Sequence, residues 1–120
     1  MSTNIRRQDN GVIIVEPHGR IVGKNVVMLQ ESIFPEVKAF DIPRILINLE
    51  HTTAISSSGL GVLIQAYKSV KQKKGRMGVI HVAQHIKNLL IVSRLTSLFE
   101  HFDTETEAVA ALNDGQPKKT

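Results

Sequence analysis

The residues of this chain best suited to chemistry are three consecutive serines within residues 56–61, the serine turn, which reads Ser-Ser-Ser-Gly-Leu-Gly. The turn lies between an almost continuously apolar run, residues 44–49, and a segment with helical apolar spacing that begins at Leu60. A serine at the start of a helix can accept a hydrogen bond from a free amide of the first turn. We therefore expect an exposed helix N-terminus, with Ser57 or Ser58 as its cap.

Such a turn is suited to phosphorylation or to phosphate binding, because the free amides and the dipole of a helix start favour negative charge. A phosphate adds about −1.5 to −2 charges, which the helix end can accommodate without a change of fold. The added charge would instead disfavour a docked partner through repulsion and desolvation. The motif thus predicts a surface whose binding is controlled by modification.

The enzymatic motifs in the sequence are incomplete. Tyr67 and Lys71 have the Tyr-x-x-x-Lys spacing of some dehydrogenases, but no Gly-x-Gly-x-x-Gly fingerprint accompanies them. No glycine stands two residues before any of the three serines, so they do not form a nucleophile elbow. A small nucleotide-binding module is a third alternative based on the glycine-containing turn, but a P-loop lysine at the required spacing is missing. We predict no catalytic residue and no enzymatic activity.

The sequence predicts neither a metal site nor a cofactor. Cysteine is absent, which removes disulfides and thiolate ligands. His81 and His85 are four residues apart but straddle an expected strand end and helix start, so we interpret them as loop residues. His51 precedes the serine turn and can titrate near neutral pH. We interpret it as a solvated loop histidine.

The composition is that of one small globular domain, with 42% hydrophobic and 22% charged residues in a chain of 120. No apolar run approaches the roughly 18–20 residues of a membrane span. The N-terminus lacks the pattern of a secretory signal. We therefore expect cytoplasmic localisation without membrane insertion.

The net charge of +4 invites a nucleic-acid interpretation, which the aromatic content does not favour. Only five aromatic residues occur, without the pattern of stacking platforms that single-strand binders use. The densest basic cluster fits the last turn of a helix that ends at Gly75, where cations complement the dipole. We predict no direct nucleic-acid binding. The cluster comprises Lys68, Lys71, Lys73, Lys74 and Arg76.

Apolar periodicity and turn residues predict alternating strands and helices. A hairpin about Asn10-Gly11 should pair residues 5–8 with residues 12–15. Pro35 should kink or break the first helix, whose apolar positions span residues 26–40. The other expected elements are strands 44–49, 77–82 and 98–102, and helices over 60–75, 86 to about 94 and, after a capping box, 108–112.

These elements predict an α/β fold in which helices pack over a sheet and right-handed crossovers join its parallel strands. The opening hairpin makes the sheet mixed rather than purely parallel. Residues 1–114 are expected to form one domain, a mixed β-sheet flanked by about four helices. Residues 115–120 are expected to be a flexible C-terminal tail.

Asn48-Leu49-Glu50, followed by Ile-Ser-Ser-Ser-Gly-Leu-Gly-Val-Leu at residues 55–63, resembles the signature of bacterial anti-sigma factor antagonists. These are STAS domains, in which the usual motif is Asp-Ser-Ser-Gly-Leu-Gly before an apolar helix. The similarity covers nearly the whole chain in element order, including the early Gly19-x-Ile21 and the late region 86–102. It implies a single STAS-like domain without catalytic activity.

The resemblance also implies a partner, an anti-sigma factor that is itself a serine kinase. In the family, the unphosphorylated antagonist binds this factor and frees the sigma factor; phosphorylation dissociates the complex, and a serine phosphatase resets it. The phosphoacceptor corresponds to Ser57, with Ser56 and Ser58 as alternatives. The implied partner-binding residues are Ser56, Ser57, Ser58, Gly59, Leu60 and Val22.

Two acidic residues of the family pattern are replaced in this chain. Ser56 stands where an aspartate usually precedes the phosphoacceptor, and Val22 stands where an aspartate usually follows the early Gly-x-Leu/Ile. A kinase that reads those carboxylates would not recognise this chain, whereas a partner with an acidic or apolar docking face would suit it. The runner-up interpretation is a non-switching STAS scaffold subunit of a signalling or transporter-associated complex.

Overall fold

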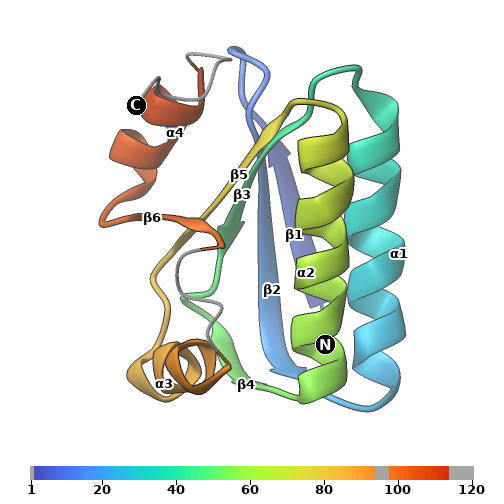
Figure 1. Ribbon diagram of the computed structural model, residues 1–120, viewed down its shortest axis with the longest axis vertical. Helices are drawn as coiled ribbons and strands as arrows, with labels where there is room; N and C mark the ends of the chain where they lie inside the picture. The colour runs from blue at the N-terminus through green and yellow to red at the C-terminus, as the bar shows by residue number, and fades with distance from the viewer. Residues whose placement is uncertain (1, 94–97, 114–120) are drawn as a thin grey trace.

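The computed structural model describes residues 2–93 and 98–113 of the chain (Figure 1). In this part of the chain, strands and helices alternate after an opening pair of strands, as the sequence predicted, except that two strands, β3 and β4, follow one another. The elements are β1 Ser2–Arg7, β2 Ile13–Ile21, α1 Lys24–Ala39, β3 Arg44–Asn48, β4 Thr52–Ile55, α2 Ser57–Gln72, β5 Arg76–Ile80, α3 Gln84–Val92, β6 Glu100–Phe102 and α4 Glu105–Asn113.

The strands form one mixed sheet in the order β1-β2-β3-β5-β6, with β4 beside the end of β2. Only β1 and β2 are antiparallel among the described pairs. The predicted turn joins them, because Gly11 has a φ of 92° and Asn10 Oδ1 accepts the amide of Val12 at 3.1 Å. The hairpin is confirmed, but its strands are longer than expected and β2 continues to Ile21.

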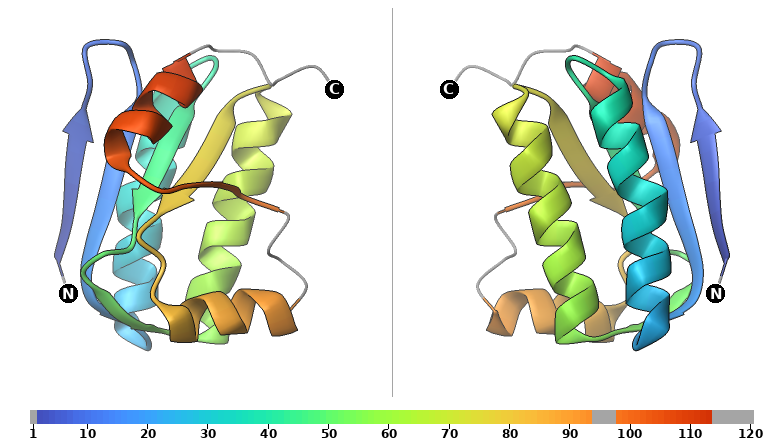
Figure 2. Two further views of the ribbon diagram at one scale, coloured as in Figure 1. Left: turned by 90° about the vertical axis from the view of Figure 1, so that its left-hand side faces the viewer. Right: turned by 90° about the vertical axis from the view of Figure 1, so that its right-hand side faces the viewer.

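Helices cover both faces of the sheet (Figures 1 and 2). α1 and α2 run side by side over one face, α4 lies on the other, and α3 crosses one end. Ile45 and Ile47 of β3 join the large core beneath α1 and α2, whereas Leu46 joins a second cluster beneath α4. Burial on both faces explains why this strand is continuously apolar.

α1 runs without a break across Pro35, so the predicted interruption is wrong. Proline removes the bond that its nitrogen would make to the carbonyl of Glu31, four residues earlier. Both residues are exposed, and water can therefore solvate that carbonyl. The buried stripe of α1, which includes Leu29 and Ile33, continues past this point and holds the helix on the sheet.

Several predicted boundaries are also corrected. β4 was not expected, because it is short and begins with the polar residues Thr52 and Thr53, which do not show the apolar pattern of a strand. The last strand starts at Glu100 rather than at residue 98. α2 ends at Gln72, and Lys74, with a φ of 61°, takes the left-handed conformation expected of Gly75. The capping threonine before α4 is confirmed: Thr104 Oγ1 accepts the amide of Glu107 at 3.1 Å.

Gly75 is required for a different reason, a close approach of two backbones. A Cβ atom there would lie 2.0 Å from the carbonyl oxygen of Pro43. Next to it, Lys73 Nζ donates to the carbonyls of Val37 and Phe40 at 2.9 and 3.0 Å, at the end of α1. Lys73 thus satisfies the end of a neighbouring helix, whereas the sequence interpretation assigned the lysine cluster to the end of its own helix.

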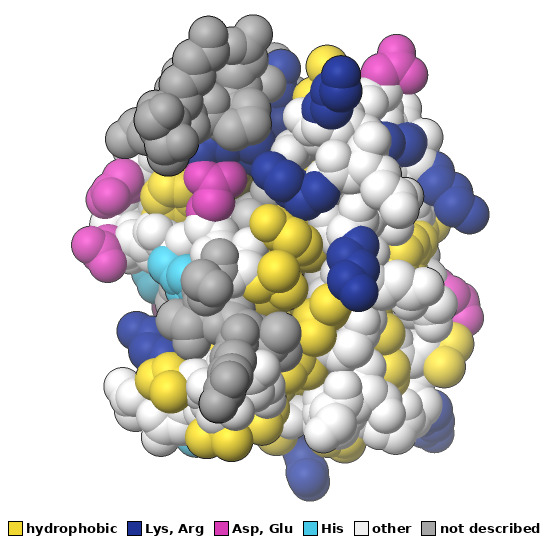
Figure 3. Space-filling model, viewed as in Figure 1, with side chains coloured by type: hydrophobic (Ala, Val, Ile, Leu, Met, Phe, Trp, Pro, Cys, Tyr) yellow, Lys and Arg dark blue, Asp and Glu magenta, His cyan; other side chains and the backbone are white. Residues whose placement is uncertain are grey.

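Two expectations fall outside the described residues, namely the end of the third helix at Arg94 and the tail 115–120. Among the described helices, none combines the length and the apolar character that crossing a membrane would require. Basic side chains gather toward the C-terminal half of α2, away from the serine turn (Figure 3).

Candidate functional site

The serine turn joins β4 to α2, and its cap is Ser56 rather than Ser57 or Ser58. Ser56 has extended backbone angles, and its Oγ accepts the amide of Gly59 at 3.1 Å. The same hydroxyl donates to the carbonyl of Ile21 at 3.3 Å, and the Ser56 amide donates to that carbonyl at 3.0 Å. The prediction placed the cap one or two residues late, because β4 had not been recognised and the chain enters the helix directly from it.

Ser57 and Ser58 are the first two residues of α2, and both are exposed. The first turn of this helix contains no acidic residue. Free backbone amides and the positive end of the helix dipole therefore surround the two hydroxyl groups. This environment favours an added negative charge.

Gly59 and Leu60 lie beneath the turn rather than on its surface. Leu60 is 5% exposed and belongs to the large core. A Cβ atom on Gly59 would lie 2.7 Å from Cγ2 and 2.8 Å from the carbonyl oxygen of Ile21. The absence of a side chain at Gly59 thus allows α2 to start directly against β2. This contact fixes the position of the two exposed serines relative to the sheet.

Replacing Gly59 with alanine is expected to destabilise the fold by about 1–3 kcal/mol, because the new methyl group must displace the backbone of Ile21. Urea denaturation followed by circular dichroism would measure the loss. The matched control is Gly61→Ala, two residues further along α2, where a Cβ atom meets nothing within 4 Å. That change should stabilise by about 0.5–1 kcal/mol through helix propensity. Equal stabilisation by both changes would contradict the close contact.

Val22 lies next to the serine turn, because Ile21 is paired with Ile55 and bonded to Ser56. Gly23, with a φ of 56°, then starts α1. The starts of α1 and α2 lie at the same end of the molecule (Figures 1 and 2). The structure therefore brings together the predicted surface residues, which we name the serine-turn face: Val22, Ser56, Ser57 and Ser58.

The serine-turn face is electropositive. Neither α1 nor α2 has an acidic residue in its first turn. Arg20 and Lys24 are exposed on either side of Val22. Two helix N-termini without acidic residues thus meet at this face, and cations precede and follow Val22 in the chain.

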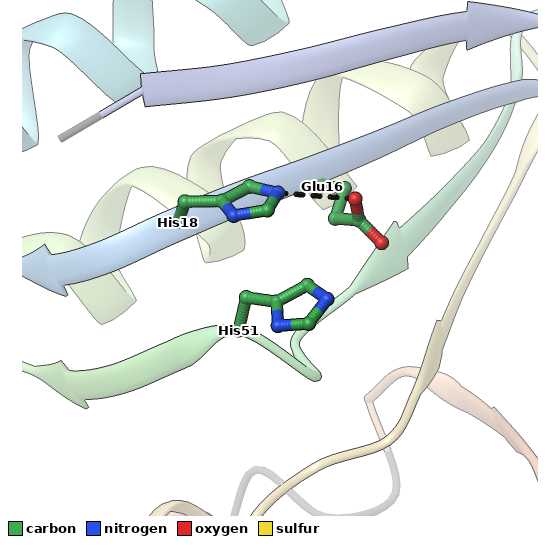
Figure 4. A group of neighbouring side chains, drawn as sticks. All are labelled: Glu16, His18 and His51. Atoms are coloured by element: carbon green, nitrogen blue, oxygen red, sulfur yellow. Dashed lines mark hydrogen bonds and ion pairs between the residues drawn. The ribbon is translucent and has the colours of Figure 1, made fainter.

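A second group of side chains, which the sequence interpretation missed, lies on the sheet face opposite α1 and α2 (Figure 4). Glu16 and His18 of β2 meet His51 from the turn before β4, and the two imidazole rings are stacked at 4.6 Å. His51 is thus half-exposed, as expected, but not isolated. His85 Nε2 instead contacts the carbonyl of Thr53 at 2.8 Å. The only sequence signal was the alternate spacing of Glu16 and His18 in a strand.

The surroundings of Glu16, the acid of this group, shift its pKa. Burial raises its pKa, but hydrogen bonds from His18 and Asn4 and the nearby charges of His18 and His51 together lower it below its usual value. The carboxylate form is therefore favoured at neutral pH. Its two oxygens contact His18 Nε2 at 3.1 Å and Asn48 Nδ2 at 2.9 Å.

Comparison of the sequence with known protein families identifies the family of this chain. The sequence profile of the STAS domain matches residues 5–108. The chain belongs to the STAS domain family. Among its relatives, the anti-sigma F factor antagonist of Paenibacillus polymyxa is 29% identical over 102 residues, which cover 85% of this chain and 87% of that protein.

Solved STAS structures show the same fold. An anti-sigma factor antagonist from Mycobacterium paratuberculosis, 24% identical, superposes with a TM-score of 0.81 and covers 94% of each chain. SpoIIAA, an anti-sigma factor antagonist and Bacillus cell fate determinant, is 16% identical in an unphosphorylated and in a phosphorylated structure. Its unphosphorylated form gives a TM-score of 0.81, covering 94% of this chain and 97% of SpoIIAA. Its phosphorylated form gives 0.73, covering 92% and 98%.

Proposed function

We propose that this STAS domain is an anti-sigma factor antagonist. It binds an anti-sigma factor that is also a serine kinase through the serine-turn face, and thereby releases a sigma factor. Phosphorylation of Ser57 switches it off, and a serine phosphatase restores it. The observation that carries the proposal is the placement of exposed Ser57 as the first residue of α2, directly after the capping Ser56.

The geometry favours Ser57 over its two neighbours as phosphoacceptor. The Ser56 hydroxyl already accepts from Gly59 and donates to Ile21, so its modification would remove the helix cap. Ser58 is exposed as well and is the remaining alternative. A phosphate on Ser57 lies at the very start of the helix, where free backbone amides can donate hydrogen bonds to its oxygens.

The partner docks on Val22 and the three serines, while buried Gly59 and Leu60 determine where these residues stand. Because Arg20 and Lys24 flank this face, its partner should present an acidic or apolar surface. The protein acts in the cytoplasm by binding alone, without catalysis or a cofactor. The name of a sequence relative, the anti-sigma F factor antagonist of Paenibacillus polymyxa, supports this class of function.

The test is to incubate the purified protein with the anti-sigma factor kinases of the same organism and ATP, and to locate phosphate by mass spectrometry. Phosphate on Ser57 is expected, with incorporation lost in Ser57→Ala and retained in Ser58→Ala. Ser56→Asp restores the acidic residue of the family pattern and keeps a good helix cap. If the kinase reads that carboxylate, this variant should be phosphorylated faster than the natural protein.

The second candidate is a non-switching STAS scaffold, which the missing acidic residues at Ser56 and Val22 favour. A scaffold would bind its partner through the same face but would not depend on modification. Stable binding without phosphate incorporation by any of the kinases, in both the natural protein and Ser56→Asp, would support the scaffold and overturn the switch.

A further inference from the structure

We propose that Glu16, His18 and His51 form a binding site for a divalent transition-metal ion such as Zn²⁺. Each residue offers one ligand atom, and the three atoms lie within 4.8 Å of one another (Figure 4). The site lies on the sheet face that carries α4, and its residues are distinct from those of the serine-turn face. The proposal is therefore independent of the function proposed above.

The backbone holds the three residues together before any ion binds. Glu16 and His18 are alternate residues of β2, so their side chains leave the same face of the sheet. His51 belongs to the turn before β4, and its carbonyl accepts the amide of Gly19 at 2.9 Å. The neighbouring Thr52 hydroxyl donates to the carbonyl of Pro17 at 3.1 Å and is buried. These two bonds fasten the turn to β2 beside His18.

The ligand atoms are close to the separation that a tetrahedral ion needs. Zn²⁺ binds histidine nitrogen and carboxylate oxygen at about 2.0–2.2 Å, which places neighbouring ligand atoms roughly 3.3 Å apart. His18 Nε2 and Glu16 Oε1 are already 3.1 Å apart. The His51 ligand atom must approach by at most about 1.5 Å. Its side chain is 48% exposed and can rotate to do so.

A hydrogen bond from a buried residue orients the carboxylate. Asn48, 3% exposed, donates from Nδ2 to Glu16 Oε2 at 2.9 Å, which leaves Oε1 facing the histidine. Ligating carboxylates in metalloproteins are commonly held in this way. Asn48 is itself fixed, because its Oδ1 accepts the amide of Glu50 at 2.9 Å.

His18 Nε2 lies within hydrogen-bond distance of two side chains, Glu16 and Asn4. Glu16 Oε1, at 3.1 Å, uses a proton on this nitrogen, whereas the Asn4 amide nitrogen, at 3.3 Å, uses a lone pair there or donates to Glu16 instead. A single ring nitrogen satisfies one of them at a time. An ion between the three side chains uses the Nε2 lone pair and the Glu16 charge together, while exposed Asn4 can turn to water.

The donor set selects the class of ion. Two imidazoles and one carboxylate suit Zn²⁺, Ni²⁺ or Cu²⁺, whereas Mg²⁺ and Ca²⁺ prefer oxygen ligands alone. Three protein ligands also leave a coordination position for water. A bound ion would cross-link β2 to the turn before β4, the strand that leads into the serine turn. It should therefore stabilise the folded chain.

The test uses the full chain, freed of any affinity tag and of metal by a chelator, and titrates it with Zn²⁺ in a calorimeter. One ion per chain is expected. Affinity should fall at least about 100-fold in His18→Ala and in His51→Ala, because each removes a ligand. His81→Asn is the matched control: this histidine is exposed, has a φ of 55° that asparagine tolerates, and belongs to no part of the site. Its affinity should be unchanged.

Two further measurements separate loss of the site from loss of the fold. Excess Zn²⁺ should raise the melting temperature of the natural chain by about 5–10 °C, and that of His51→Ala by less than about 2 °C. Because His51 is half-exposed, His51→Ala should retain the natural circular dichroism spectrum. Co²⁺ in place of Zn²⁺ should give the visible absorption of a low-symmetry site with nitrogen ligands. The proposal would be overturned if the natural chain bound no Zn²⁺ at concentrations up to about 100 µM. Equal Zn²⁺ affinity of His51→Ala and the His81→Asn control would also overturn it.

Discussion

Replacing Ser57 with aspartate is expected to weaken binding of the anti-sigma factor kinase at least about 100-fold, a loss of about 3 kcal/mol. The natural side chain is small, neutral and exposed at the first position of α2. A carboxylate there must be desolvated when a partner covers the turn. If the partner presents an acidic surface, as Arg20 and Lys24 suggest, like-charge repulsion adds to that loss.

The same substitution should leave the fold unchanged or slightly more stable. A negative charge in the first turn of a helix is favourable by about 0.3–1 kcal/mol. The Ser56 cap and the Gly59 contact with Ile21 do not involve the Ser57 side chain. Loss of binding with an unchanged melting temperature would therefore place the effect in the docking surface, not in folding.

Thr106→Asp is the matched control for added charge. Thr106 is exposed in the first turn of α4, between Glu105 and Glu107, so the substitution introduces the same charge at a helix start that already carries two acidic residues. α4 lies on the opposite face of the sheet from α2 (Figure 2). Calorimetry should show natural affinity for Thr106→Asp. Equal affinity for Ser57→Asp would instead exclude Ser57 from the interface and, with it, the proposed switch.

Local patterns in the sequence were sufficient to predict most of the fold. Ile45, Leu46 and Ile47 are consecutive because the strand is covered on both faces, and that pattern needs no knowledge of distant residues. The serine turn was predictable for a similar reason. Its hydroxyl groups, glycines and following apolar helix are adjacent in the chain, so their types alone indicate a helix start.

Features that depend on distant contacts were not predictable from local patterns. Ser56 is the cap because β4 is paired with β2 up to Ile55, and β4 itself is too short and polar to be recognised. Pro35 is tolerated because packing of the opposite helix face outweighs one lost hydrogen bond. His51 meets His18 only because the turn before β4 is bonded to Gly19. In each case the deciding interaction crosses more than ten residues of sequence.

Replacing Arg76 with methionine is expected to reduce the free energy of unfolding by about 3 kcal/mol, the largest stability effect that we predict. Arg76 begins β5, and its side chain is only 6% exposed. Its guanidinium pairs with both carboxylate oxygens of Glu100 in β6 and donates to the carbonyl of Ala111 at 2.6 Å. One side chain therefore joins a central strand to the short last strand and to α4.

The Ala111 carbonyl lies in the last described turn of α4, where a cation complements the helix dipole. Methionine keeps the apolar stem but leaves this carbonyl and the Glu100 carboxylate without the guanidinium. Glu100 is 37% exposed, so water can solvate its carboxylate once the guanidinium is removed. The expected decrease in the free energy of unfolding is therefore smaller than for a fully buried ion pair.

Arg44→Met is the matched control, because Arg44 is the register partner of Arg76 on the adjacent strand. Its Nη1 makes only two contacts of 3.4 Å among the described residues, and its Nε has no hydrogen-bond partner there. Removing it should therefore change stability by less than about 1 kcal/mol. Thermal unfolding should show a melting temperature lower by about 10 °C for Arg76→Met and nearly unchanged for Arg44→Met. An equal loss of stability in the two variants would contradict this prediction. It would mean that burial of the aliphatic part of arginine at the start of β3 or β5, rather than the hydrogen bonds of the Arg76 guanidinium, attaches α4 and β6 to the sheet.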